Sequence, residues 1–150
     1  MLRAILAALM LLAGSLAPAV AGTVNEVNGI AIKGYDPVAY FTLQRATPGS
    51  SQFEYQWDEH LWRFATAAHR DLFKSDPVRY APQFANFCAV ALARGEVREA
   101  NPEYWLISDG KLYLFGKSIG PDLFRKDQNY IERANSNRAL LSRPQEPAGK

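Results

Sequence analysis

Residues 104–115 read YWLISDGKLYLF, and this stretch is the strongest indicator of local structure in the chain. Two apolar runs, 104–107 and 112–115, flank the pair Asp109-Gly110. An Asp-Gly pair between apolar runs is typical of the tight turn of a β-hairpin, since both positions must adopt a positive φ. The stretch therefore predicts two antiparallel strands joined at Asp109-Gly110.

Residues 53–64, FEYQWDEHLWRF, predict a second hairpin. Phe53, Tyr55 and Trp57 alternate with polar residues, which is the period of a strand with one buried face. Residues 57–60 form the expected turn, and 61–64 the returning strand. A short strand is also expected at 30–32, where two isoleucines flank an alanine.

Helices are predicted between and after these hairpins. Thr66 is expected to cap a helix that ends near Ser75, and Asp36-Pro37 and Asp76-Pro77 are typical helix starts. Two further amphipathic helices are predicted. The first ends at Gly95, and the second begins at Pro121. The apolar stripe of the first holds Phe84, Phe87, Cys88, Ala91 and Leu92, and that of the second holds Leu123, Tyr130, Ile131 and Ala134. Together these elements predict a single small α+β domain, in which short antiparallel hairpins pack against several helices.

The first 21 residues, MLRAILAALMLLAGSLAPAVA, resemble a secretory signal peptide. A short positive start, an apolar stretch and the sequence Ala-Val-Ala predict cleavage before Gly22 and export to the periplasm or the medium. The apolar run is too short to span a bilayer, so no stable membrane insertion is expected after cleavage. The expected domain then covers residues 22–141, and the polar tail 142–150 is expected to be disordered.

Composition narrows the function. The chain has 150 residues, of which 48% are apolar and 12% aromatic, and its formal net charge is +2. Its 17 basic residues are not gathered into runs, which argues against a nucleic-acid partner. No Cys-x-x-Cys, Gly-x-Ser-x-Gly, glycine-rich phosphate loop or His-Glu-x-x-His motif is present. We therefore expect a non-enzymatic protein.

Several segments together resemble the YHS domain, in particular its exported single-domain branch. They are residues 34–41 (GYDPVAYF), 62–66 (WRFAT), 70–73 (RDLF), 76–83 (DPVRYAPQ), 87–89 (FCA) and 109–114 (DGKLYL). The resemblance implies a small module related to cysteine-rich metal binders, with ligand positions that correspond here to Ala39, Ala65 and His69. Two of these positions are alanine and cannot coordinate an ion. The exported branch also commonly has two glycines where this chain has Ala85 and Asn86.

Cys88 and His69 are the candidate metal ligands, with copper or zinc as the ion. The chain has one cysteine and two histidines, too few for a four-ligand zinc site built from Cys and His, whereas copper accepts a smaller set. Each residue has a simpler alternative: Cys88 as a small core residue, His69 as a core-edge histidine bonded to a carbonyl, and His60 as a solvated turn residue.

Two other functions remain open at this stage. The first is a metal-free module that binds a protein or a small ligand through an aromatic surface. The second is an enzyme that uses the Cys88 thiol, with His69 as its partner.

Overall fold

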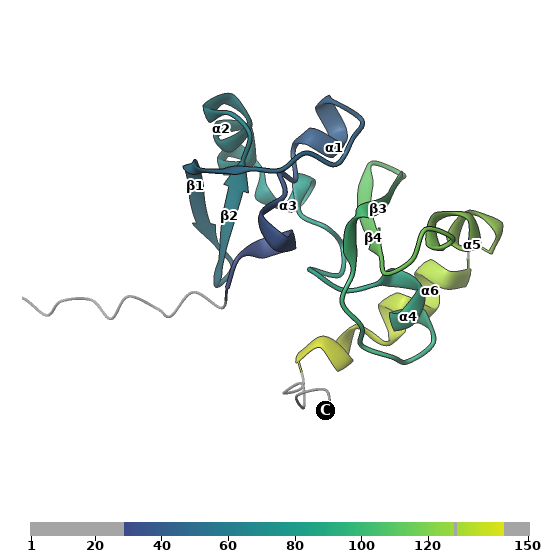
Figure 1. The fold of residues 1–150 in the computed structure, drawn as a ribbon. Helices are drawn as coiled ribbons and strands as arrows, with labels where there is room; N and C mark the ends of the chain where they lie inside the picture. Colours follow the sequence, from purple (N-terminus) through teal and green to yellow (C-terminus); the bar gives the residue numbers. More distant parts are fainter. Residues whose placement is uncertain (1–28, 128, 143–150) are drawn as a thin grey trace, which may run out of the picture.

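The computed structural model describes residues 29–127 and 129–142, and within them the chain has an α+β fold (Figure 1). Two antiparallel hairpins, each a two-stranded sheet, pack against short helices. This confirms the predicted fold class. The signal peptide predicted for residues 1–21 lies outside the described residues, as does the predicted tail beyond Ser142, the residue that ends the last 3-10 helix. No helix among the described residues has the length and apolar character needed to cross a membrane.

The first half of the molecule is built on hairpin β1–β2 (Figure 1). Its elements, in chain order, are η1 (Ala31–Gly34), α1 (Ala39–Thr42), β1 (Ser50–Trp57), β2 (His60–Phe64), α2 (Ala67–Ser75) and α3 (Pro77–Tyr80). Phe73 of α2 is fully buried at its centre, with ring centroids 4.8 Å from Trp62, 5.2 Å from Phe64 and 5.7 Å from Trp57. The aromatic residues of the hairpin thus form a core around one side chain of α2.

The second half is built on hairpin β3–β4 (Figure 1). Its elements are α4 (Ala89–Ala93), β3 (Asn101–Ser108), β4 (Lys111–Phe115), α5 (Gly120–Lys126), α6 (Asn129–Ser136) and η2 (Arg138–Ser142). The rings of Tyr113, Phe115 and Tyr130 surround Phe124 of α5 with centroid distances of 4.8, 5.3 and 6.4 Å.

Strand β4 separates the two hydrophobic cores. Leu112 and Leu114 belong to the core of the first half, whereas Tyr113 and Phe115 belong to the core of the second. Successive side chains of a strand point to opposite faces, so one strand supplies both cores. All four side chains are buried, which explains why 112–115 is continuously apolar rather than alternating.

Both predicted hairpin turns are confirmed. Asp58 and Glu59 have φ values of 49° and 61°, and Asp109 and Gly110 have values of 51° and 70°. Residues on either side of each turn pair directly, Trp57 with His60 and Ser108 with Lys111. The predicted caps are also present: the Thr66 hydroxyl accepts the His69 N–H at 3.1 Å, and the Asp76 carboxylate accepts the Arg79 N–H at 3.2 Å.

The helix predicted from the Phe84–Cys88 stripe begins later than expected. Helix α4 starts at Ala89, with Cys88 as its N-cap and Gly95 (φ 80°) just beyond its end. The residues before it pair with a distant segment instead: the Cys88 N–H donates to the Arg98 carbonyl at 2.8 Å, and the Ala100 N–H donates to the Asn86 carbonyl at 2.7 Å. These long-range bonds replace the first turns of the predicted helix.

Two other local predictions are wrong. Residues 31–34 form the 3-10 helix η1 rather than a strand, with Ile32 and Lys33 at φ values of 41° and 53°. The helix expected from Pro121 is divided into α5 and α6 at Asp127, which has an extended backbone (φ −136°, ψ 97°). The Asp127 carboxylate accepts the Asn129 N–H at 3.0 Å and so begins a new helix.

Ala85 has a positive φ of 50°, and it is the first of the two positions where the resemblance implies glycine. A left-handed conformation costs a residue with a Cβ about 1–2 kcal/mol. We expect Ala85→Gly to raise the free energy of unfolding by up to about 1 kcal/mol, after the greater freedom of glycine in the unfolded chain is counted. Urea denaturation followed by circular dichroism measures this change.

The matched control for that variant is Ala68→Gly. Ala68 is also exposed but lies in the first turn of α2, where glycine is less favourable than alanine by up to about 1 kcal/mol. The two substitutions should therefore shift stability in opposite directions. A loss of stability in Ala85→Gly equal to that in Ala68→Gly would contradict the inferred backbone strain.

Tyr40 joins the two halves, because its buried hydroxyl donates to the Pro102 carbonyl at 2.9 Å. Burial raises the pKa of this hydroxyl far above its usual value of about 10, so the folded state keeps the proton that the unfolded chain releases at high pH. The stability that this difference supplies is complete below about pH 10 and is lost as pH rises above it.

In Tyr40→Phe we expect the free energy of unfolding to fall by about 1–3 kcal/mol at neutral pH, because a buried carbonyl loses its donor. Unfolding midpoints between pH 9 and pH 11 should also fall less steeply in the variant, and equal slopes would contradict this account.

Candidate functional site

The carboxylate of Asp36 is fully buried and accepts four hydrogen bonds. Oδ1 accepts the N–H groups of Val38 and Ala39 at 2.8 and 3.2 Å, which caps the start of α1. Oδ2 accepts the Ala65 N–H at 2.8 Å and lies 2.6 Å from Nδ1 of His69. One charged group thereby ties together α1, the end of β2 and helix α2.

His69 lies between Asp36 and Thr42. Its Nδ1 faces the carboxylate, which can only accept, so Nδ1 is the donor in that contact. Its Nε2 lies 3.1 Å from the Thr42 hydroxyl oxygen. The Thr42 hydroxyl donates its proton to the Val38 carbonyl, at 3.1 Å. The His69 side chain is 12% exposed. It is the core-edge histidine considered above, except that its partner is a carboxylate rather than a carbonyl.

The order carboxylate, imidazole, hydroxyl is the order found in a hydrolase triad. Here the Thr42 hydroxyl bonds to the carbonyl four residues before it, as Ser and Thr do inside helices. Asp36 is fully buried and the His69 side chain is 12% exposed, and their hydrogen bonds join α1, the end of β2 and α2. The three side chains thus hold elements of the first half together.

The three positions that the resemblance implies as metal ligands meet at one point. Ala39 and Ala65 donate their backbone N–H groups to Asp36, and His69 contacts the same carboxylate. Methyl side chains supply no donor atoms, and both His69 nitrogens have hydrogen-bonding partners. This arrangement does not fit a metal ion.

Cys88 and His69, predicted as joint ligands, are not brought together. His69 is on α2 and Cys88 is at the start of α4, and these helices lie at opposite ends of the molecule (Figure 1). The Cys88 side chain is buried, and its Sγ accepts the Ala91 N–H at 3.5 Å. Within the described residues, no three His, Cys, Asp or Glu side chains form a group able to hold a metal ion.

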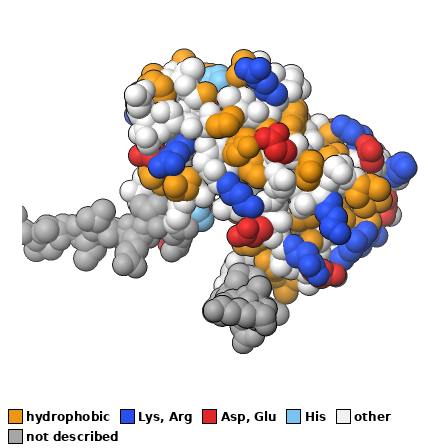
Figure 2. Space-filling view, viewed as in Figure 1, with side chains coloured by type: hydrophobic (Ala, Val, Ile, Leu, Met, Phe, Trp, Pro, Cys, Tyr) orange, Lys and Arg blue, Asp and Glu red, His pale blue; other side chains and the backbone are white. Residues whose placement is uncertain are grey.

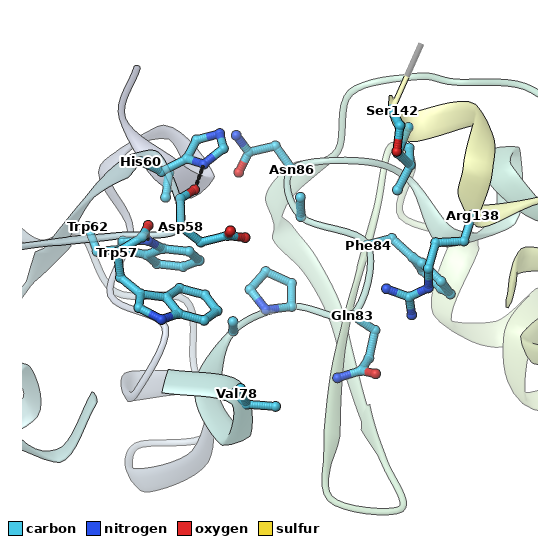
Figure 3. Close-up of a pocket in the computed structure, with 15 residues that line it drawn as sticks. Trp57, Asp58, His60, Trp62, Val78, Gln83, Phe84, Asn86, Arg138 and Ser142 are labelled. Atoms are coloured by element: carbon cyan, nitrogen blue, oxygen red, sulfur yellow. Dashed lines mark hydrogen bonds between the residues drawn. The ribbon is translucent and has the colours of Figure 1, made fainter. Parts of the chain in front are cut away.

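A cleft of about 370 Å³ lies between the two halves (Figure 3). One wall comes from the β1–β2 turn and carries Trp57, Asp58 and His60. The opposite wall comes from Phe84 and from η2, which carries Arg138. Sequence reasoning counted these aromatic residues among the core and missed Asp58 and Arg138, because nothing in the local pattern places residue 138 beside residue 58.

The aromatic wall of the cleft is held in place by its own contacts. The Trp62 indole N–H donates to the Trp57 carbonyl at 2.9 Å, and the ring centroids of these residues are 5.8 Å apart. His60, predicted as a solvated turn residue, is half-buried, and its Nδ1 lies 2.7 Å from the Asp58 carbonyl. Two hydrogen-bonded contacts thus hold the backbone of this turn against the side chains of Trp62 and His60.

The side of the cleft nearest η1 has an unusual backbone. The Asn86 side-chain oxygen accepts the Ile32 N–H at 2.5 Å, and Ile32 is a buried β-branched residue at φ 41°. Such a conformation is a real outlier for isoleucine. Ala85, next to Asn86, also has a positive φ. Strained positions of this kind concentrate at ligand sites and are held there by surrounding structure.

Figure 2 shows Lys, Arg, Asp and Glu side chains on this face of the molecule, with several Lys and Arg side chains near one another over the second half. In comparisons with known proteins, no family model, no curated protein and no solved structure matches this chain. The functional argument therefore depends on the geometry of the chain itself.

The Asp36 network predicts a large effect for one substitution. In Asp36→Asn one of the two carboxylate oxygens is replaced by an amide NH2 group. This group cannot accept hydrogen bonds, so it would face the backbone or imidazole donors that the oxygen had satisfied. We expect the free energy of unfolding to fall by about 3 kcal/mol, because the buried donors that bonded to the lost oxygen no longer have an acceptor. Denaturation in urea, followed by circular dichroism, measures the loss.

Asp76→Asn is the matched control, since Asp76 also precedes a proline and also caps a helix. It is exposed, and asparagine is as good an N-cap as aspartate, so its effect should be close to zero. Equal effects of the two substitutions would show that Asp36 acts only as a cap.

Proposed function

We propose that this protein is a non-catalytic binding module that takes a small ligand in the cleft between its two halves. The observation that carries this proposal is the cleft itself: about 370 Å³, lined by the aromatic side chains of Trp57, Trp62 and Phe84 together with polar groups. Small-ligand sites are typically concave, mostly apolar and about 300–1000 Å³ in volume, with few polar groups that orient the ligand. The backbone strain at Ile32 and Ala85 supports a functional role for the same region.

A metal-free module is favoured over copper or zinc binding. His69 already has hydrogen-bonding partners at both ring nitrogens, and Cys88 is buried in the other half of the molecule. An ion at Nδ1 of His69 would displace Asp36 and leave a fully buried carboxylate without one of its donors, which is costly. An ion at Nε2 would displace only Thr42, but the described residues contain no group of three His, Cys, Asp or Glu side chains that could hold it.

A thiol enzyme is favoured least. Cys88 borders a second groove of about 1290 Å³ that also contains Lys117 and Arg94. Its side chain nevertheless belongs to the second core and the residue is only 8% exposed. A reactive cysteine needs an accessible thiolate, so burial argues against this function.

Membership of the YHS family and export from the cytoplasm belong to the same proposal. Residues 39, 65 and 69 all contact Asp36. This supports membership of the YHS family, because the resemblance implies that these three positions belong to one site. The positive φ at Ala85 supports it as well, since this is a position of an expected glycine. Export is supported by the sequence of residues 1–21.

The cleft is tested with the fluorescent aromatic anion 8-anilinonaphthalene-1-sulfonate as the probe. Val78 borders the cleft and is 71% exposed, so Val78→Trp should narrow it without disturbing the core. We expect this variant to bind the probe at least about tenfold more weakly, a loss of about 1.4 kcal/mol. Copper and zinc, titrated into the same protein, test the metal alternative.

The control is Leu72→Trp, which adds a similar side chain at an exposed apolar residue of α2, outside the cleft. It should bind the probe like the parent protein. Equal affinities of the parent and the Val78→Trp protein would show that the cleft is not the binding site.

A further inference from the structure

Two charged side chains of opposite sign face each other across the cleft. Figure 3 shows the Asp58 carboxylate on one wall and the Arg138 guanidinium on the other, both directed toward the space between them. The rest of the lining is mostly apolar, notably at Trp57, Pro82 and Phe84, and it also includes the side-chain amides of Gln83 and Asn86. The cleft thus carries a negative charge on one wall, a positive charge on the other, and a mostly apolar surface besides.

Among the described residues, no side chain pairs with the Asp58 carboxylate. Its backbone has a φ of 49° in the tight β1–β2 turn, and its backbone carbonyl lies 2.7 Å from His60 Nδ1. Its side-chain oxygens accept no hydrogen bond from any residue that the structure describes. A cationic group placed here would meet the carboxylate, which attracts it, on a wall that the indole rings of Trp57 and Trp62 also line.

Arg138 is the counterpart on the other wall. Its guanidinium carbon lies 5.0 Å from the centroid of the Phe84 ring, which is 2% exposed and therefore a fixed platform. One of its nitrogens donates to the Asn135 side chain at 3.2 Å, and no carboxylate in the described part of the chain forms a salt bridge with it. A guanidinium has five N–H donors in a planar fork, so most of its capacity remains for a ligand carboxylate.

We propose that the ligand of this cleft is a short peptide with free termini, its ammonium group at Asp58 and its carboxylate at Arg138. This inference rests on the proposed function and names the ligand class for the same site. A single amino acid carries both charges on one carbon, whereas a dipeptide separates them along an extended backbone and offers an apolar side chain to the rings that line the cleft. A ligand with one charge would leave either Asp58 or Arg138 unpaired.

The probes are three forms of one dipeptide, phenylalanyl-alanine: with free termini, with an acetylated amine, and with an amidated carboxyl group. Titration calorimetry at low ionic strength gives their affinities for the full chain. We expect the free dipeptide to bind about tenfold more tightly than either blocked form, because each block removes one charge-assisted contact.

Two variants assign each charge to its residue. Asp58→Asn should abolish the preference for the free amine while retaining the preference for the free carboxylate, and Arg138→Gln should do the reverse. Asp109→Asn is the matched control for the first, because Asp109 occupies the corresponding turn of β3–β4 at φ 51°. Arg125→Gln, an exposed arginine of α5 that pairs with Asp122 in its own helix, is the control for the second. Both controls should behave like the parent protein.

The outcomes separate this inference from the proposal on which it rests. Equal binding of all three dipeptide forms, or no binding of any of them, would overturn the peptide assignment. If Val78→Trp still weakens binding of the anilinonaphthalene probe, the cleft remains a ligand site of another chemistry. If Val78→Trp has no effect on that probe either, the proposed function fails as well.

Discussion

The first half of this molecule depends on one buried charge. Asp36 is fully buried, and the free-energy cost of removing its carboxylate from water is offset only because four donors surround it. Those donors come from the start of α1, the end of β2 and helix α2. The two helices are short, and short helices are stabilised by tertiary contacts rather than by helix propensity. The carboxylate therefore fixes the relative positions of three elements that are separate along the chain.

Strand β4 has the corresponding role for the whole molecule. Its alternate side chains enter the two cores, so neither half is complete without it. The Tyr40 hydroxyl bond to Pro102 is a second link between the halves. The cleft is a consequence of this arrangement. The two cores lie on opposite faces of hairpin β3–β4, and the β1–β2 turn of one half approaches η2 of the other beside that hairpin. Trp57 and Arg138 border the cleft from the two sides.

Local patterns predicted those parts of the structure whose contacts are close in sequence. Both hairpins were predicted, because Asp109-Gly110 and the alternation through Trp57 describe interactions between neighbouring residues. The caps at Thr66 and Asp76 were predicted for the same reason. The start of α4 was not, because residues 86–88 bond to residues 98–100 instead of continuing the helical pattern. Nor was the turn at Ile32, whose backbone depends on Asn86.

For the candidate site, the sequence alone determined the inventory: one cysteine, two histidines, a rich set of aromatic residues, and alanines at two positions where the resemblance implies ligands. It also determined that Asp36 would accept bonds from the amides that follow it. Only the tertiary structure decided that His69 would join the same carboxylate, that Cys88 would lie in the other half, and that Asp58 and Arg138 would face each other. The physical reason is range: a cap or a tight turn is an interaction between residues a few positions apart, whereas a cleft is formed by side chains that only the packing of both cores brings together.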